Sequence, residues 1–462
     1  MSGESRARTY GMFAIVVLGC ALGGLSQTAV NAMLPEILAE FGVDVSLGQW
    51  LTTGYMLALG VTVPVVTFAS RRFSDKALLA AALALFLVGS LVDLFAAGFL
   101  TLLVGRLLQA VSTGLTMPFM QTIGMTRFPA HRRGMAMGVA GIAMGFAPNI
   151  GPTIGGAMVY SLSWHSFFIL LAGLSGALLV AALLLVRREP PADATARLDA
   201  LSLAFSVLGF GGLLLGFSNA SSFALENPLV WAPALAGAAV LVLFVLRQRK
   251  VARPLIDMGI FRSQRFVAGF VALNLLCASF MGITLIVPLY VEGACGGTSL
   301  DAGLVLLPET VAALVLNPLS GALTDRFGAR PVALVAGAFL TIGAASMAFV
   351  SESTPLWLVT ALQAVRSCGV SGLMPALNTW LMSDLPRGIV SDGSSFGLAA
   401  RQACSSLGTA LMVFAITTFT PLAASGEAGL ALPYQAAFGV SALFAVATLV
   451  CIAGWIRPMH RA

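Results

Sequence analysis

Long apolar stretches, separated by short polar segments, follow one another along the whole chain. They fall at about 11 to 34, 47 to 70, 77 to 98, 99 to 126, 134 to 160, 164 to 187, 199 to 220, 229 to 247, 266 to 291, 300 to 324, 330 to 351, 354 to 383, 388 to 421 and 433 to 456. Each is long enough for an α-helix to cross the hydrocarbon core of a bilayer, which takes about 20 residues. The pattern therefore predicts an all-α membrane protein with fourteen transmembrane helices.

The composition leaves little chain outside the bilayer. Of the 462 residues, 58% are hydrophobic and 10% are charged, which does not suit a water-exposed surface. The histidines and cysteines are scattered, and no cluster of acids or histidines marks a reaction centre at the water boundary. We therefore expect no metal, no cofactor and no enzymatic activity.

The charged residues predict how the chain is oriented. If both chain ends lie on one side, every basic residue except Arg106, Arg366 and Arg401 falls on that side, which the positive-inside rule assigns to the cytoplasm. The loops of the other side carry only acids: Glu36, Glu40, Asp44, Glu226, Glu292, Asp301, Glu352 and Glu427. The net charge of +6 thus reflects orientation in the membrane and does not indicate nucleic-acid binding.

An internal repeat appears when the chain is shifted by 254 residues. The matched pairs are Pro64 with Pro318, Arg72-Phe73 with Arg326-Phe327, Lys76 with Arg330, Gln109 with Gln363 and Arg133-Gly134 with Arg387-Gly388. The repeat predicts two six-helix bundles, residues 1–190 and 263–462, with two additional helices in 191–262. A solute site is then expected between the bundles near mid-membrane.

Two segments have motif character. The fifth apolar stretch contains Pro148, Gly151, Pro152, Gly155 and Gly156, in which glycines permit close helix packing and prolines remove backbone hydrogen bonds. An ordinary glycine-rich packing face is the alternative. The loop near 321–330 combines glycines with an acid and basic residues: Gly321, Asp325, Arg326, Gly328 and Arg330. Its acid can accept hydrogen bonds from a helix amino terminus and so hold one side shut.

These segments resemble the fourteen-span drug:proton antiporter branch of the major facilitator superfamily. The Pro148 segment is similar to the family's GPxxGG motif, Gly321–Arg330 to its gating loop, Arg106–Gln109 to RxxQG and Leu25–Pro35 to LDxTVxNxALP. Two positions depart from the family pattern. Ser26 stands where many members carry an aspartate, and in the loop near 67–75 Thr67, Arg71, Ser74 and Asp75 replace glycine, aspartate, glycine and arginine.

The resemblance implies a secondary active transporter of a bacterial cytoplasmic membrane. It would work as a monomer, exporting amphipathic, cationic or zwitterionic drugs in exchange for protons by alternating access. Ser26 and the altered first loop favour an alternative, a lipid or glycolipid carrier with weak or no proton coupling.

Ionisable residues inside apolar stretches are the candidates for proton coupling. An arginine at the centre of a span costs about 2.5 to 3.5 kcal/mol, so such residues face a cavity or a partner. Asp93 and Arg106 lie at similar depth on adjacent spans, which makes a pair sterically plausible, whether it serves proton transfer or only structure. Glu309 is either a proton carrier or a wet residue of the outer vestibule, and no partner is evident for Arg366.

A pocket for lipophilic solutes is expected to combine amides with aromatic side chains. The candidates for the substrate cavity are Gln27, Asn31, Phe119, Gln121, Phe146, Asn149, Asn274, Tyr290, Asn317, Asn378 and Arg401.

Overall fold

The computed structural model describes residues 3–187, 189–190, 193, 199–219, 227–251, 254–424 and 429–456. Within these residues it contains helices and no strands. In the described part of the chain, thirteen helices are long and apolar enough to cross a membrane, or fourteen if the bent pair α3 (Trp50–Thr62) and α4 (Val65–Arg72) forms one span. The predicted all-α membrane fold is confirmed.

The helices follow the predicted stretches closely. In the first part of the chain they are α1 (Gly3–Phe41), the short α2 (Val45–Gly48), α5 (Asp75–Leu94), α6 (Phe99–Thr126), α7 (Arg133–Gly141), α8 (Ala147–Ser161) and α9 (Trp164–Leu185). Two helices come next, α10 (Ala200–Asn219) and α11 (Pro228–Gln248). The last part contains α12 (Gln264–Phe280), α13 (Ile283–Gly293), α14 (Ser299–Phe327), α15 (Ala329–Met347), α16 (Leu356–Met382), α17 (Val390–Ala424) and α18 (Leu432–Trp455).

Proline explains one break. The second predicted span bends by 50° between α3 and α4, where Pro64 provides no backbone N–H for the helix. The fifth span stays continuous, because a π-helical turn at Ile142–Phe146 joins α7 to α8.

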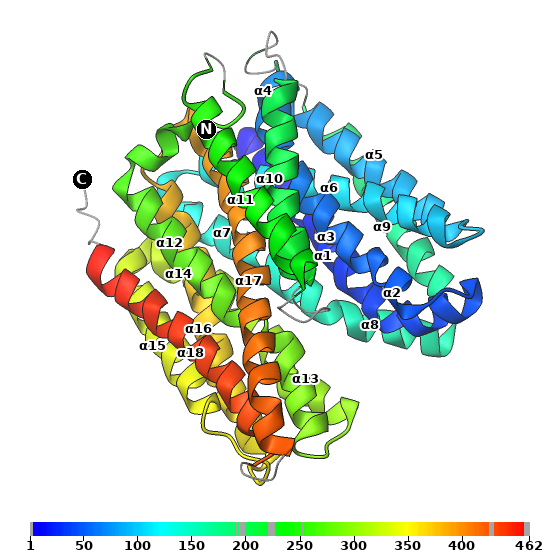
Figure 1. Ribbon diagram of the computed structural model, residues 1–462. Coiled ribbons are helices and arrows are strands. Elements are labelled where there is room, and N and C mark those ends of the chain that lie inside the picture. Colours follow the sequence, from blue (N-terminus) through cyan, green and yellow to red (C-terminus); the bar gives the residue numbers. More distant parts are fainter. Residues whose placement is uncertain are drawn as a thin grey trace.

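Corresponding helices pack against each other in the two parts of the chain. The contact of α1 with α8 has its counterpart in α12 with α17, and that of α3 with α6 in α14 with α16. Likewise α5 contacts α6 and α9, as α15 contacts α16 and α18. We call α1 to α9 the first half and α12 to α18 the second half. Figure 1 shows that the two halves lie close together near the chain's amino terminus and diverge toward the opposite end.

The two additional helices, α10 and α11, pack mainly on each other. α10 also contacts α3 of the first half and α17 of the second. It therefore lies beside the contact between the halves.

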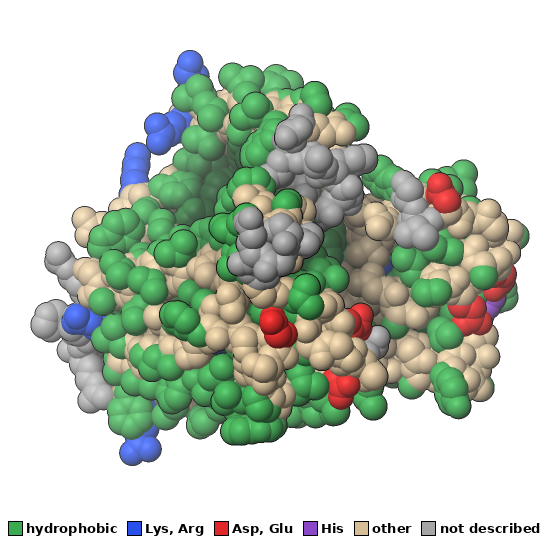
Figure 2. Space-filling view, turned by 60° about the horizontal axis from the view of Figure 1, so that its bottom comes forward, with side chains coloured by type: hydrophobic (Ala, Val, Ile, Leu, Met, Phe, Trp, Pro, Cys, Tyr) green, Lys and Arg blue, Asp and Glu red, His purple; other side chains and the backbone are tan. Residues whose placement is uncertain are grey.

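Charge separates the two ends of the molecule. We call the end that carries Arg71, Arg127 and Arg387 the basic end and the opposite end, with Glu40 and Glu352, the acidic end. Figure 2 brings the acidic end forward and shows Asp and Glu side chains on this face, with Lys and Arg mainly at its margin. Some residues of the charge pattern lie outside the described residues, namely Arg188, Arg197, Arg253, Arg457, Arg461, Glu226 and Glu427.

Candidate functional site

The glycine and proline segment of α8 packs directly on α1. A Cβ atom at Gly155 would lie 2.6 Å from the carbonyl oxygen of Ala29, and one at Gly151 would lie 3.0 Å from that of Leu25. Pro152 has no N–H for the carbonyl of Pro148, and the Thr28 hydroxyl of α1 donates to that oxygen instead, at 2.6 Å. The motif therefore fixes a close contact within the first half. Gly156 has only an ordinary contact with Ala32.

The first half holds a buried arginine with neutral partners. Arg106 is fully buried and donates to the carbonyl and hydroxyl oxygens of Ser26 at 2.9 and 2.6 Å and to Gln109 Oε1 at 3.1 Å. Its guanidinium also lies 4.4 Å from the ring centroid of Tyr55, a cation–π distance. Ser26, the departure from the family motif, thus contributes hydroxyl and carbonyl acceptors and no negative charge.

The direct pair considered for Asp93 and Arg106 is not formed. Asp93 is fully buried beside Gly105, yet neither of its carboxyl oxygens has a hydrogen-bond partner, and Arg106 Nη2 is also unpartnered. Asp93 lies at the depth of Gly105, next to Arg106, but the rotation of α6 directs the guanidinium toward Ser26 of α1 and Tyr55 of α3.

The second half holds a buried acid and base in contact. Arg366 Nη2 lies 3.0 Å from Glu309 Oε2, and its Nε donates to Gln363 Oε1 at 2.9 Å. Gln363 donates back to Glu309 at 3.1 Å. Glu309 is 5% exposed and Arg366 is fully buried, so Glu309 is not a wet vestibule residue. Asn149 of α8 lies close to the Glu309 carboxyl and brings the first half to this cluster.

The repeat register relates these two clusters. Gln109 corresponds to Gln363, and Tyr55, which stacks on Arg106, corresponds to Glu309. Each half therefore places an arginine of its fourth span, which donates to a glutamine of the same span, against one side chain of its second span. Only the second half puts an acid there.

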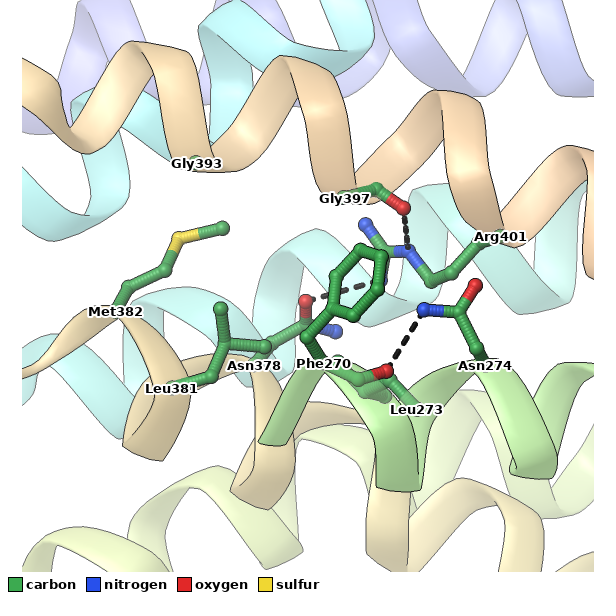
Figure 3. Close-up of a pocket in the computed structure, with 9 residues that line it drawn as sticks. All are labelled: Phe270, Leu273, Asn274, Asn378, Leu381, Met382, Gly393, Gly397 and Arg401. Atoms are coloured by element: carbon green, nitrogen blue, oxygen red, sulfur yellow. Dashed lines mark hydrogen bonds between the residues drawn. The ribbon is translucent and has the colours of Figure 1, made fainter. Parts of the chain in front are cut away.

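A third polar cluster joins the halves in the part of the helices nearer the basic end. Arg401 of α17 donates to Asn378 Oδ1 at 2.9 Å, to the Gly397 carbonyl at 3.2 Å and to Gln121 Oε1 of α6 at 3.4 Å. Ser394 donates to the same Gln121 oxygen at 2.9 Å. Figure 3 shows Arg401, Asn378 and Asn274 around a cavity of about 10 Å³ whose walls include Phe270 and Met382.

The other predicted cavity residues lie in several places. Asn317 is buried and donates to the Gly141 carbonyl across the halves at 2.9 Å. Asn31 accepts from Thr52, and Gln27 and Phe146 are half-buried. Two aromatics predicted for the cavity lie in hydrophobic clusters and line neither the Arg401 cavity nor the larger cavity at the basic end, so their cavity role stays a prediction. Phe119 packs in the core of the first half, and Tyr290 packs in the core of the second half, where its hydroxyl donates to the Ser351 carbonyl at 2.8 Å.

The gating loop closes the basic end on one side. Asp325 accepts from the backbone N–H groups of Gly134 and Met135 at 2.7 and 2.8 Å, the amino-terminal turn of α7. Gly321 lies against the Gly134 backbone, and Gly328 has a φ of +88° in the turn to α15, a conformation that suits glycine. Arg326 lies over the Phe327 ring, and Arg330 Nε is buried.

A second contact closes the basic end on the other side, and the sequence did not reveal it. Arg71 Nη2 donates to both oxygens of Asp392 at 2.9 and 2.6 Å, and the Asp392 side chain is fully buried. Arg71 corresponds to Asp325 by the repeat register, and Asp392 lies in the first turn of α17. The sequence signal for this ion pair was a basic residue in the altered first loop together with an acid at the start of the facing helix.

A larger cavity of about 730 Å³ lies at the basic end, lined by residues that include Arg127, Asp75 and Glu189. Burial acts to lower the pKa of Arg127, but contacts with Glu189 and Asp75 at 2.6 and 2.7 Å outweigh it and raise that pKa. This ion-pair network ties the end of α6 to the loop after α9. The cavity is separate from the three intramembrane clusters.

The close contact at Gly134 gives a testable prediction. A Cβ atom at Gly134 would lie 2.6 Å from Asp325 Oδ1 and against the Gly321 carbonyl, so Gly134→Ala should separate α7 from α14. We expect maleimide labelling of a cysteine at Thr324, which is 3% exposed, to become about tenfold faster, since overpacking costs about 1 to 3 kcal/mol. Gly388, at the equivalent position of the second half, has no atom within 4 Å of its Cβ position, so Gly388→Ala is the matched control. Equal labelling of the two variants would contradict the prediction.

Two similarly packed helical halves, with polar clusters inside them and at their contact, are the architecture of a polytopic membrane transporter. The chain belongs to the Major Facilitator Superfamily, whose family model matches residues 16–412. It is a transporter and not an enzyme.

Relatives and solved structures agree with this assignment. The chain is 33% identical over 446 residues to the uncharacterized MFS-type transporter YcnB of Bacillus subtilis, covering 96% of this chain and 93% of that protein. It is 30% identical over 415 residues to the lincomycin resistance protein LmrB of Listeria monocytogenes, covering 89% and 87%. The proton:xylose symporter XylE shares the fold at a TM-score of 0.68 and 13% identity, covering 98% and 97%.

Proposed function

We propose that this protein is a proton-coupled exporter of amphipathic small molecules, in the fourteen-span drug:proton antiporter branch of its family. It would act as a monomer in a bacterial cytoplasmic membrane, with both chain ends in the cytoplasm. The observation that carries the proposal is the buried cluster of Glu309, Arg366 and Gln363 beside Asn149 of the glycine and proline motif. A buried ionisable pair at the contact between the halves is expensive to maintain and can respond to a proton.

The cluster suggests how a proton changes the contact between the halves. When Glu309 is ionised, its carboxylate holds the Arg366 guanidinium and Gln363. Protonation removes that charge, so Arg366 loses its ionic partner. The contact of the Glu309 carboxyl with Asn149 of α8 then changes as well. One proton entering down about 100 mV contributes about 2.3 kcal/mol to this cycle.

Asp93 is a second candidate proton carrier. Its carboxyl group is buried and unpartnered, and a carboxylate in that state is costly, whereas the protonated form is tolerated. It lies near Arg106, whose hydrogen-bond partners are all uncharged. A proton at Asp93 would alter the field at Arg106 without a direct ion pair.

Proteoliposomes loaded with the pH dye pyranine test the proposal. With an acidic interior, we expect external ethidium to accumulate while protons leave, and nigericin, which collapses the pH gradient, should abolish accumulation. Asp93→Asn should weaken this coupling. Ethidium accumulation that survives nigericin and moves no protons would contradict proton coupling.

The departure at Ser26 favours a second candidate function. Because Ser26 brings no negative charge to Arg106, the first half lacks the acid that many relatives have there. The chain would then be a lipid or glycolipid carrier with weak or no proton coupling. Movement of a fluorescent phospholipid in the same vesicles, without change in pyranine signal, would support this alternative.

A further inference from the structure

Three arginines lie inside the predicted spans, and they differ in their neighbours. Arg366 contacts the carboxylate of Glu309, and Arg106 lies close to Asp93. Arg401 is 6% exposed, and among the described residues no acid lies within 4.0 Å of its guanidinium. Its hydrogen-bond acceptors are the uncharged oxygens of Asn378, Gly397 and Gln121. Arg401 is therefore a buried positive charge without a contacting counter-ion.

The position of Arg401 suits a solute site. Arg401 comes eleven residues after Val390, the first residue of α17, which is about 16 Å along a helix. Its Nε donates to the Gly397 carbonyl one turn nearer the start of α17, so the guanidinium lies between the basic end and the middle of a hydrocarbon core about 30 Å thick. Its bond to Gln121 of α6 crosses from the second half to the first.

The cavity beside Arg401 also carries a hydrogen-bond acceptor without a partner. Asn274 of α12 lines the cavity, is 8% exposed and donates through Nδ2 to the Phe270 carbonyl at 2.7 Å. Its Oδ1 is buried without a hydrogen-bond partner. Figure 3 shows this amide beside the Arg401 side chain. A buried acceptor of this kind is costly unless a donor reaches it.

We infer that the solute has an anionic group next to an N–H or O–H donor, with Arg401 binding the anion and Asn274 Oδ1 accepting from the donor. This inference rests on the proposed function only in that the solute is an amphipathic small molecule carried between the halves. It predicts that compounds with an anionic group bind more tightly than purely cationic ones, which remain weaker substrates. The cavity of about 10 Å³ has room for one small polar group, so the apolar body of the solute lies outside it.

Binding of dansyl compounds to the purified full-length protein in nanodiscs tests the inference. Dansylglycine carries a carboxylate next to a sulfonamide N–H, dansylglycinamide lacks the charge, dansylsarcosine lacks the N–H, and dansylcadaverine is cationic. By fluorescence titration we expect dansylglycine to bind at least about tenfold more tightly than dansylglycinamide or dansylcadaverine, because its charge-assisted hydrogen bonds are the strong ones. It should also bind several-fold more tightly than dansylsarcosine.

Variants assign these preferences to residues. Arg401→Gln should remove the preference for dansylglycine over dansylglycinamide, and Asn274→Leu should remove the preference over dansylsarcosine. Arg249→Gln changes an exposed arginine and should retain both. If the wild-type protein binds dansylcadaverine or dansylglycinamide as tightly as dansylglycine, or Arg401→Gln keeps the carboxylate preference, the inference fails.

The comparison of the four dansyl compounds on the wild-type protein tests the inference even if Arg401→Gln does not fold. Binding in nanodiscs requires no proton gradient, whereas the test of the proposed function is nigericin-sensitive accumulation in vesicles. Failure of one is thus distinguishable from failure of the other.

Discussion

Reversing the charge of Arg71 is expected to reduce transport at least about tenfold. Arg71→Asp places a second acid against the buried Asp392 and leaves the Asp392 carboxylate unpaired. Leaving a buried charge unpaired costs about 3 to 5 kcal/mol. Arg71 Nη2 contacts both Asp392 oxygens, and Ser70 and Ser391 lie 3.0 Å apart beside them. The double variant Arg71→Asp with Asp392→Arg restores opposite charges and should recover much of the activity.

The repeat explains why this pair matters. In the second half the loop residue is Asp325, and it binds two backbone N–H groups at the start of α7. At the equivalent loop position the first half has Arg71, which could not accept those bonds, and the facing helix supplies Asp392 instead. The basic end is therefore held by two contacts of opposite polarity. The first loop departs from the family pattern and still contributes a closing contact of its own.

Ethidium accumulation in proteoliposomes measures the effect, and Arg72→Asp is the matched control. Arg72 is an exposed neighbour, so this variant makes the same charge change in the same loop away from Asp392. It should keep most of the activity. If Arg72→Asp and Arg71→Asp are equally impaired, or if the double variant is no better than Arg71→Asp alone, the contact does not serve closure.

Much of the fold could be predicted because membrane spans leave strong signals in sequence. Apolar length gives the helices, and a shift of 254 residues relates Gln109 to Gln363, which lie in corresponding clusters. Loop motifs carry similar information, because the Asp325 contact depends on a short segment with fixed turns.

Side-chain partners were harder to predict, because they depend on the rotation of each helix about its axis. Arg366 and Glu309 are 57 residues apart, and no local pattern joins them. Depth alone suggested a pair of Asp93 with Arg106, but α6 turns its arginine toward Ser26. Aromatic residues are equally ambiguous, because the same residue types line cavities and fill hydrophobic cores. Tyr290, for example, packs in a core.

Replacing Glu309 by glutamine is expected to abolish proton-driven accumulation while leaving solute exchange across the membrane. Glutamine keeps the size and an acceptor for Gln363, but it cannot carry a proton, so a pH gradient no longer biases the cycle. Exchange of labelled for unlabelled ethidium at equal pH needs no net proton movement and should continue. The exposed acid Glu292 provides the matched control, since Glu292→Gln should keep both activities.

Stability must be separated from coupling in this test, because Glu309→Gln leaves the Arg366 charge buried without its ionic partner. Breaking such a pair from one side costs about 3 to 5 kcal/mol, whereas removing both charges is often nearly neutral. We therefore expect Glu309→Gln to lower the thermal midpoint and the double variant Glu309→Gln with Arg366→Gln to recover it without recovering proton-driven accumulation. Recovery of accumulation together with stability would show that Glu309 only supports the fold. Another group would then have to carry the proton, and the buried Asp93 of the first half would be the next candidate.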